Sequence, residues 1–185
     1  MNGGIQLREE VAVDSMVITR SGTERVVRFA FELAKKRARS ESRVTCVDKA
    51  NVFKSMAFFR SIYDEVAADF PQVQTDYAYV DALSMYLIQK PQFYDVLVAE
   101  NMYGDIISDL AAGLIGGLGM APSADIGSDV AVFQPSHGTA PDIANKGLAN
   151  PIAMVLSAAL MLPVVFQFFA NIYSSSAASI GNFFI

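Results

Sequence analysis

The run YDVLVAE at residues 94–100 constrains the fold more than any other stretch, because it is almost continuously apolar. Such a run is typical of a strand buried in the sheet of an α/β protein. Two further strand-like runs precede it, RVTCVD at 43–48 and VQTDYAY at 73–79, and amphipathic segments with helical spacing separate the three. Strands that alternate with helices predict a layered α/β fold, with a parallel sheet and flanking helices.

Helices are expected over 21–39 and 55–70, and from about residues 81, 104 and 151 onward. The first is predicted to begin with a capping box formed by Ser21 and Glu24. The basic cluster KKRARSESR at 35–43 is expected to be the end of that helix, where the dipole favours cations. The glycines of 113–119 follow a helix instead of a strand, so they lack the context of a dinucleotide fingerprint. A loop is expected there, followed by a short strand at 130–135.

Composition narrows the function classes. The 185 residues carry a net charge of −5, which argues against an electrostatic nucleic-acid binder. The single cysteine, Cys46, excludes an internal disulfide, which fits a reducing compartment. With one cysteine and one histidine, a metal site must use carboxylates, which favour Mg²⁺ or Mn²⁺.

The first 15 residues are polar and acidic, so no signal peptide is expected. We expect a cytoplasmic protein, or one of the mitochondrial matrix if the source is eukaryotic.

Charged side chains gather where predicted strands end. Asp105 and Asp109 lie four residues apart on one helical face, where two like charges repel each other and call for a cation. Lys49 follows the strand at 43–48, and Asp81 follows the strand at 73–79. Strand ends are where ligand sites of α/β proteins usually lie. Three carboxylates and a lysine there can hold a divalent cation and supply a base.

Four motifs carry a family resemblance: VDKAN, YVDALSMYL, ENMYGDIISDLAAGLIGGLGMAPSADIG and FQPSHGTAPDIANKGLANPIA. In this order and spacing they resemble the isocitrate/isopropylmalate dehydrogenases, a family of metal-dependent β-decarboxylating enzymes that includes tartrate and D-malate dehydrogenases. The resemblance implies an oxidoreductase that uses NAD and Mg²⁺ or Mn²⁺ to oxidise and decarboxylate a 2-hydroxy acid. It also implies a homodimer, with no nucleic acid and no membrane as partner.

The resemblance assigns roles to the clustered charges. Asp105 and Asp109 would coordinate the metal together with the substrate, and Asp81 would join them from the other subunit of the dimer. The metal would act as a Lewis acid that lowers the pKa of the substrate hydroxyl. Lys49, also from the partner subunit, would be the general base for the hydroxyl proton.

The same resemblance places the cofactor. Asn51 would contact substrate and nicotinamide, and the adenine–ribose part would lie against His137, Gly138, Ala140 and Asn150. Asp142 stands where relatives that use NADP tend to carry a basic residue. Its negative charge would repel a 2′-phosphate and accept hydrogen bonds from a free 2′-hydroxyl, which favours NAD.

Two departures from the family pattern are expected to matter. Residues 1–162 would form a partial domain of this fold, without the N-terminal βαβ units that carry the arginines for the substrate carboxylates. Ile18 stands near the position of the tyrosine that many relatives use as a general acid. Residues 163–185 would be a divergent apolar tail, from a truncated or misassembled gene product.

The sequence therefore leaves three interpretations. The first is a fragment of a decarboxylating dehydrogenase that is inactive alone. The second is a non-catalytic subunit or paralogue that acts through the dimer interface. The third is a membrane-anchored protein, supported only by the tail, for which packing against the core is the simpler alternative.

Overall fold

The computed structural model describes residues 4–174 of the chain, with side chains as far as residue 164. The chain forms two compact units, Met1–Asp105 and Ile106–Ile185, which are described separately here. Helix α4, Asn101–Leu114, runs across the boundary between them.

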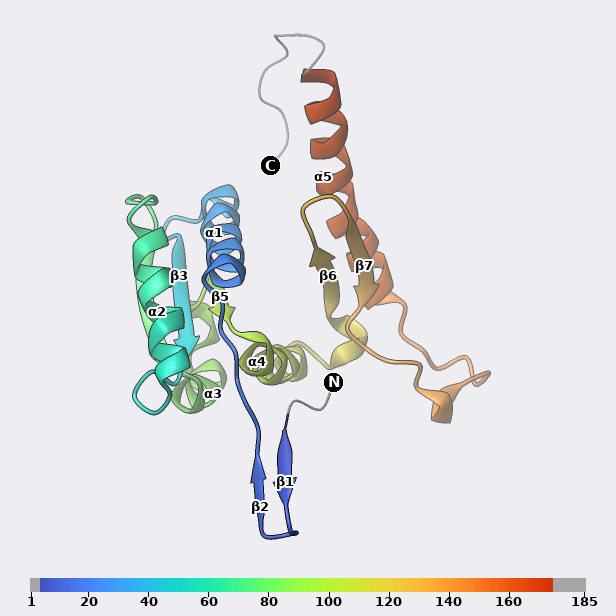
Figure 1. The fold of residues 1–185 in the computed structure, drawn as a ribbon. Helices are drawn as coiled ribbons and strands as arrows, with labels where there is room; N and C mark the ends of the chain where they lie inside the picture. The colour runs from blue at the N-terminus through green and yellow to red at the C-terminus, as the bar shows by residue number, and fades with distance from the viewer. Residues whose placement is uncertain (1–3, 175–185) are drawn as a thin grey trace. The chain divides into compact units, whose positions relative to one another are not determined.

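The first unit is built on a parallel sheet of three strands, β3 (Arg43–Asp48), β4 (Gln74–Tyr79) and β5 (Val96–Ala99), in the order β4-β3-β5. Figure 1 labels β3 and β5 of this sheet. In this register Cys46 lies opposite Tyr77 on one side and Val98 on the other. The three strands predicted from apolar patterning are thus confirmed. Because they are parallel, their carboxyl ends all meet one edge of the sheet.

Two helices form a core with this sheet. α1 (Arg20–Arg37) and α2 (Lys54–Ala67) pack against each other and contact β3, and α1 also contacts β5. Their buried side chains include Phe31 and Ile62, which join Val44, Cys46 and Val98 of the sheet in one cluster. The third helix of the unit, α3 (Val80–Gln89), follows β4 directly and contacts β4 and β3. Cys46 is buried in this core, as expected of a packing residue.

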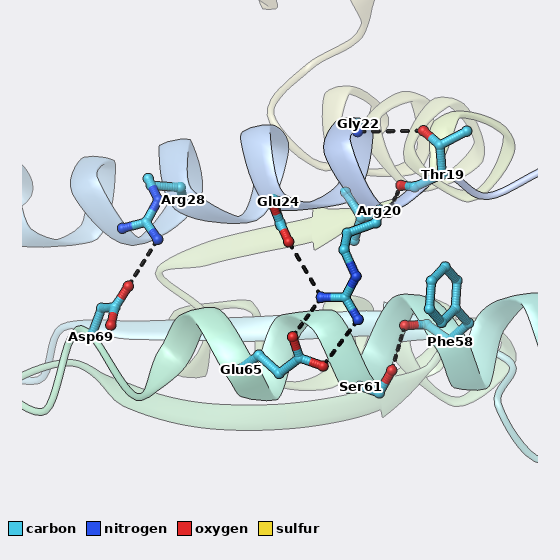
Figure 2. A network of polar contacts seen from close by, with 10 residues as sticks. Thr19, Arg20, Gly22, Glu24, Arg28, Phe58, Ser61, Glu65 and Asp69 are labelled. Atoms are coloured by element: carbon cyan, nitrogen blue, oxygen red, sulfur yellow. Dashed lines mark hydrogen bonds and ion pairs between the residues drawn. The ribbon is translucent and has the colours of Figure 1, made fainter.

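The start of α1 corrects one expectation. The N-cap is Thr19, whose Oγ1 accepts a hydrogen bond from the Gly22 N–H at 3.3 Å (Figure 2). Ser21 already lies inside the helix, which begins at Arg20. The Thr19 backbone is extended, which is the geometry that presents a hydroxyl to the first turn. Glu24 does not reach back to a backbone N–H in a capping box. Its carboxylate pairs with the Arg20 guanidinium at 3.3 Å.

Figure 2 also shows how polar side chains link α1 to α2. Arg20 bonds both carboxylate oxygens of Glu65, at 2.5 and 3.2 Å, and Arg28 bonds Asp69 at 2.8 Å. The hydrogen bonds from Arg20 lower the pKa of the Glu65 carboxyl. Because these pairs are exposed to solvent, they contribute little to stability beside the apolar cluster beneath them.

The basic end of α1 lies where it was predicted. Lys35, Lys36 and Arg37 occupy the last turn, and Ala38 ends the helix in the left-handed conformation with φ 45°. The Arg37 Nε donates to the Asp95 carboxylate at 2.8 Å. This contact ties the end of α1 to the residue that precedes β5, so part of the basic cluster has a structural use.

An antiparallel hairpin of β1 (Ile5–Leu7) and β2 (Val11–Val13) precedes α1 and was not expected. Each strand has three residues, too short for a periodic signal. All six residues are exposed, and a two-stranded hairpin alone is marginally stable.

The second unit contains β6 (Pro122–Ile126), β7 (Ala131–Pro135) and α5 (Ile152–Ser174), which packs on both strands. The prediction recovered β7 and α5 but assigned 122–126 to a loop, whereas these residues pair antiparallel with β7. Pro122 misled that reading, although proline is tolerated as the first residue of a strand. The buried Ser157 of α5 joins the three elements, since its Oγ accepts from Ser123 N–H at 3.3 Å and lies 2.8 Å from the Gln134 carbonyl.

α5 continues through Leu162 and Pro163, where the division between domain and tail was placed. That division stays a prediction, because most of 163–185 lies outside the described side chains. Among the described residues, no helix combines the length and the apolar character needed to cross a bilayer.

Candidate active site

Lys49 and Asp81 meet at the carboxyl edge of the three-stranded sheet. Lys49 follows β3 and Asp81 lies in the first turn of α3, which follows β4. The Lys49 Nζ is 2.6 Å from the Asp81 Oδ1, and the two side chains are 21% and 65% exposed. The hydrogen bond from Lys49 lowers the pKa of the Asp81 carboxyl. Two residues singled out separately in the sequence are therefore one ion pair that is open to solvent.

A second pair lies beneath this one and was missed at the sequence level. Asp48, the last residue of β3, is fully buried, and its carboxylate accepts from the Nε and Nη2 of Arg60 at 2.7 and 2.8 Å. Arg60 comes from α2, and the bond to Asp48 raises its pKa. The sequence did offer a signal for this pair, namely an aspartate at a strand end and an arginine twelve residues later. Only the position of α2 in the structure identifies these two residues as partners.

The two aspartates of α4 share the expected helical face by their i, i+4 spacing, and both are exposed. The helix begins after Glu100, whose carboxylate accepts from the backbone N–H groups of Met102 and Tyr103 at 3.0 and 2.8 Å. Asp105 also lies within 3.5 Å of the Asn101 side-chain amide. Glu100 thus caps the start of the helix that carries the two carboxylates, a role that the sequence analysis did not assign.

The donor set of α4 fits a hard cation only in part. Asp105 and Asp109 supply carboxylate oxygens, which suit Mg²⁺ or Mn²⁺. Within residues 4–174, no three His, Cys, Asp or Glu side chains gather closely enough to enclose a metal ion. Two ligands from α4 would therefore need a third from elsewhere, which is the part expected of Asp81 in a partner subunit.

In the second unit, the loop after β7 lines an open cavity of about 460 Å³. Four of the predicted cofactor residues line it, namely His137, Gly138, Ala140 and Asn150. The His137 Nδ1 lies 2.8 Å from the Gly138 carbonyl, and the Asn150 Oδ1 accepts from Ile152 N–H at the start of α5. The loop motif and the start of α5 thus converge on one space.

Two non-glycine residues of this loop have a left-handed backbone conformation. Ala140 has φ 43° and Asn145 has φ 61°, both in the left-handed region. For alanine this conformation costs about 1–2 kcal/mol, so it persists only where the surroundings impose it. Such backbone strain is typical of ligand-binding loops.

The cavity does not include every predicted cofactor residue. Asp142 lies in the 3₁₀ turn Pro141–Ile143 and is exposed, but it is not among the lining residues. Asn51 belongs to the first unit, where it is exposed in the turn after β3. Conversely, Gly119 lines the cavity, although the glycine-rich stretch that contains it was set aside. That stretch forms no fingerprint turn, but its 3₁₀ turn Leu118–Met120 brings Gly119 to the loop.

Comparison with known proteins decides the family. The family model described as isocitrate/isopropylmalate dehydrogenase matches residues 2–179. The chain belongs to this family. The match includes both the Lys49–Asp81 pair and the loop of the second unit.

Individual members of the isocitrate/isopropylmalate dehydrogenase family are also similar to this chain in sequence and structure. The 3-isopropylmalate dehydrogenase of Archaeoglobus fulgidus is 54% identical over 147 residues, which are 79% of this chain and 44% of that enzyme. A probable tartrate dehydrogenase/decarboxylase of Bacillus subtilis is 45% identical, over 83% of this chain and 44% of its own length. The crystal structure of isocitrate dehydrogenase from Methylococcus capsulatus superposes with a TM-score of 0.81 at 47% identity, over 88% of this chain and 48% of that one.

The α/β fold expected from the resemblance is thereby confirmed, since this solved isocitrate dehydrogenase shares it. The chain spans about half the length of the curated relatives that it matches. Ile18, which the resemblance places near the tyrosine general acid of many relatives, is partly buried and packs against the α1–α2 core, which is an apolar role.

Proposed function

We propose that this chain is part of an NAD-dependent, Mg²⁺- or Mn²⁺-dependent oxidoreductase that oxidises and decarboxylates a 2-hydroxy acid. The substrate class is that of isocitrate, isopropylmalate, malate or tartrate. The observation that carries the proposal is the Lys49–Asp81 pair at the carboxyl edge of the sheet, in a chain of the isocitrate/isopropylmalate dehydrogenase family. Edges of this kind are where α/β proteins place ligands.

Lys49 is the proposed general base. It would accept the proton of the substrate hydroxyl while the hydrogen on the same carbon leaves as hydride to the nicotinamide. The resulting keto group then takes up, as an enolate, the electron pair of the bond between the adjacent carbon and its carboxylate as CO₂ departs, and a proton replaces the carboxylate on that carbon. The Lys49 side chain is partly exposed, which leaves a bound substrate room to reach it.

Asp105 and Asp109 are the proposed metal ligands of this chain, joined by Asp81 of a second copy. A divalent cation held there would supply Lewis-acid polarisation of the substrate oxygens. The protein's own contribution is helix α4, whose start Glu100 caps by accepting from Met102 N–H and Tyr103 N–H.

The loop cavity of the second unit is the proposed site for the adenine–ribose part of NAD. Its size and its lining by small residues, with polar groups at His137 and Asn150, suit a flat base and a sugar. Asp142 stands beside the lining residue Ile143 and would repel a 2′-phosphate, so NAD is preferred to NADP. Asn51 is proposed to contact the substrate and the nicotinamide from the first unit. A homodimer in the cytoplasm, or in the mitochondrial matrix of a eukaryote, completes the proposal.

The alternative is a non-catalytic subunit or paralogue that acts through the dimer interface. It is favoured by the exposed apolar side chains of α3 and α4, among them Ile88 and Ile106. A non-catalytic subunit needs no substrate, so an activity assay distinguishes this alternative from the first proposal.

The test is NADH absorbance with Mn²⁺ and each of the four acids, for the 185-residue chain and for a chain extended to the full length of its relatives. We expect turnover from the extended chain with at least one acid and none from the shorter one. Substrate positioning accounts for roughly 7–11 kcal/mol of an enzymatic barrier, and metal ligands and base alone do not supply it. A Lys49→Met version of the extended chain should lose turnover while it still binds NAD.

Turnover by the 185-residue chain would contradict its proposed inactivity but support the assigned chemistry. An extended chain that binds NAD and Mn²⁺ but turns over none of the four acids would favour the non-catalytic alternative.

A further inference from the structure

Asp48, the residue before Lys49, is buried and paired with Arg60. Its carboxylate is fully buried and accepts two hydrogen bonds from Arg60, at 2.7 and 2.8 Å. A bidentate bond between guanidinium and carboxylate fixes distance and direction together. The pair therefore defines where the end of β3 lies relative to α2.

The same carboxylate also reaches past Lys49. The Asp48 Oδ1 accepts from the backbone N–H of Ala50 at 2.8 Å. The buried Asp48 carboxylate therefore fixes the backbone on both sides of Lys49. Asp48 precedes Lys49 as the last residue of β3, and Ala50 follows it. This arrangement limits the directions in which the Lys49 side chain can leave the sheet.

A shared aromatic ring links Arg60 to Lys49 a second time. The Arg60 guanidinium lies 5.4 Å from the centroid of the Tyr79 ring, and the Lys49 Nζ lies 5.6 Å from the same centroid. Tyr79 is the last residue of β4 and precedes the helix that carries Asp81. Cations over an aromatic face are attracted by its quadrupole. Contact with the Tyr79 ring therefore favours the orientation in which the Lys49 side chain reaches Asp81.

We propose that Arg60 is a positioning residue for Lys49, acting through Asp48 and Tyr79 to keep the lysine directed at Asp81. Arg60 does not take part in proton or hydride transfer. The inference rests on the proposed role of Lys49 as the base and adds a residue on which the geometry of that base depends.

The experiment follows the Lys49 side chain itself by NMR of the 185-residue chain. The order parameter of the Lys49 Cε methylene and the slow water exchange of its ammonium protons report the contact with Asp81. We expect Arg60→Gln to lower the order of Lys49 to that of the exposed Lys36, with loss of the protected ammonium signal. Arg60→Lys, which keeps the charge without the bidentate bond, should restore only part of both signals.

A matched control separates positioning from stability. Ile62→Val changes a fully buried residue of the same helix, α2, whose aliphatic side chain cannot hydrogen-bond Asp48. It should lower the melting temperature while the Lys49 signals stay unchanged. An effect of Ile62→Val as large as that of Arg60→Gln would show a merely structural role and overturn the proposal.

If Arg60→Gln does not fold, Tyr79→Leu decides, because Tyr79 is exposed and its removal spares the buried pair. Loss of Lys49 order in Tyr79→Leu supports the proposal, and unchanged order in a folded Arg60 or Tyr79 variant overturns it. Neither readout needs turnover. A failed dehydrogenase assay with an ordered, Arg60-dependent Lys49 would refute the proposed function alone.

Discussion

Tyr77 offers a residue whose titration tests the geometry beside the candidate site. Its hydroxyl donates to the Asp64 carboxylate at 2.6 Å, and this bond, with burial, raises the pKa of Tyr77 to about 12. The folded state therefore favours the neutral phenol. The stability that it contributes is complete below the ordinary tyrosine pKa of about 10 and is lost as the pH rises towards about 12.

The measurement is a ring-carbon NMR titration of Tyr77 in the parent chain and in Asp64→Ala. The variant should titrate closer to the ordinary tyrosine value. Asp69→Ala, which removes an α2-end carboxylate that pairs with Arg28 instead, is the control and should leave Tyr77 unchanged. An identical midpoint in the parent and in Asp64→Ala would show that the hydrogen bond is absent in solution.

The carboxylates of α4 give a second prediction at this scale. The 185-residue chain should bind Mn²⁺ or Mg²⁺ weakly, because Asp105 and Asp109 place two hard oxygen donors on one helical face. Calorimetry should show this binding lost in the double variant Asp105→Ala/Asp109→Ala. Asp125→Ala/Asp129→Ala removes the same charge from exposed positions of the β6–β7 hairpin and should not lose it. Equal affinity in the two double variants would rule out a site on α4.

At the residue scale, sequence reasoning identified groups with unusual chemistry but not their partners. Lys49, Asp81 and the four cavity residues were recognisable from motif and position. That Lys49 bonds Asp81 of the same chain was not, because a contact across 32 positions depends on strand order. Arg60 was missed for the same reason, since its carboxylate partner is the buried last residue of β3, on another element.

Among the helices, α4 depends on a carboxylate at its beginning. Glu100 accepts from two backbone N–H groups that have no partner within the helix, and a side chain of this kind contributes about 0.5–2 kcal/mol. Glu100→Ala should therefore lower the free energy of unfolding by that amount in urea denaturation. Glu32→Ala, at an exposed position within α1, should stay within about 0.5 kcal/mol of the parent. A Glu100→Ala variant as stable as Glu32→Ala would contradict the capping role.

Helices and strands could be predicted from the sequence where burial requires apolar residues at a regular spacing. β3, β5 and α2 carry apolar residues at the spacing that their burial requires, and all three were found. β6 was missed because its pairing with β7 comes from backbone bonding in a stretch rich in small polar residues. The start of α1 was misplaced by two residues, since Thr19 and Ser21 are equivalent caps by residue type and only the extended backbone of Thr19 selects it.

For the whole molecule, the exposed apolar surface is the property with the clearest consequence. Met85 and Ile88 of α3 are 47% and 62% exposed, and Met102 and Ile106 of α4 are 48% and 55% exposed. Apolar patches of this kind mark association sites or aggregation liabilities. We therefore expect the 185-residue chain to self-associate at micromolar concentration.

Sedimentation velocity measures this directly, and charge placed on the two helices should reverse it. Ile88→Lys/Ile106→Lys adds two cations at exposed positions and should shift the chain towards monomer, because burying an unpaired ammonium in an apolar contact is costly. The matched control, Val17→Lys/Val130→Lys, adds the same charge at positions 77% and 76% exposed outside these helices and should not dissociate the assembly. A parent chain that sediments as a clean monomer would contradict the expectation. Equal dissociation by both double variants would instead attribute the association to net charge and not to the faces of α3 and α4.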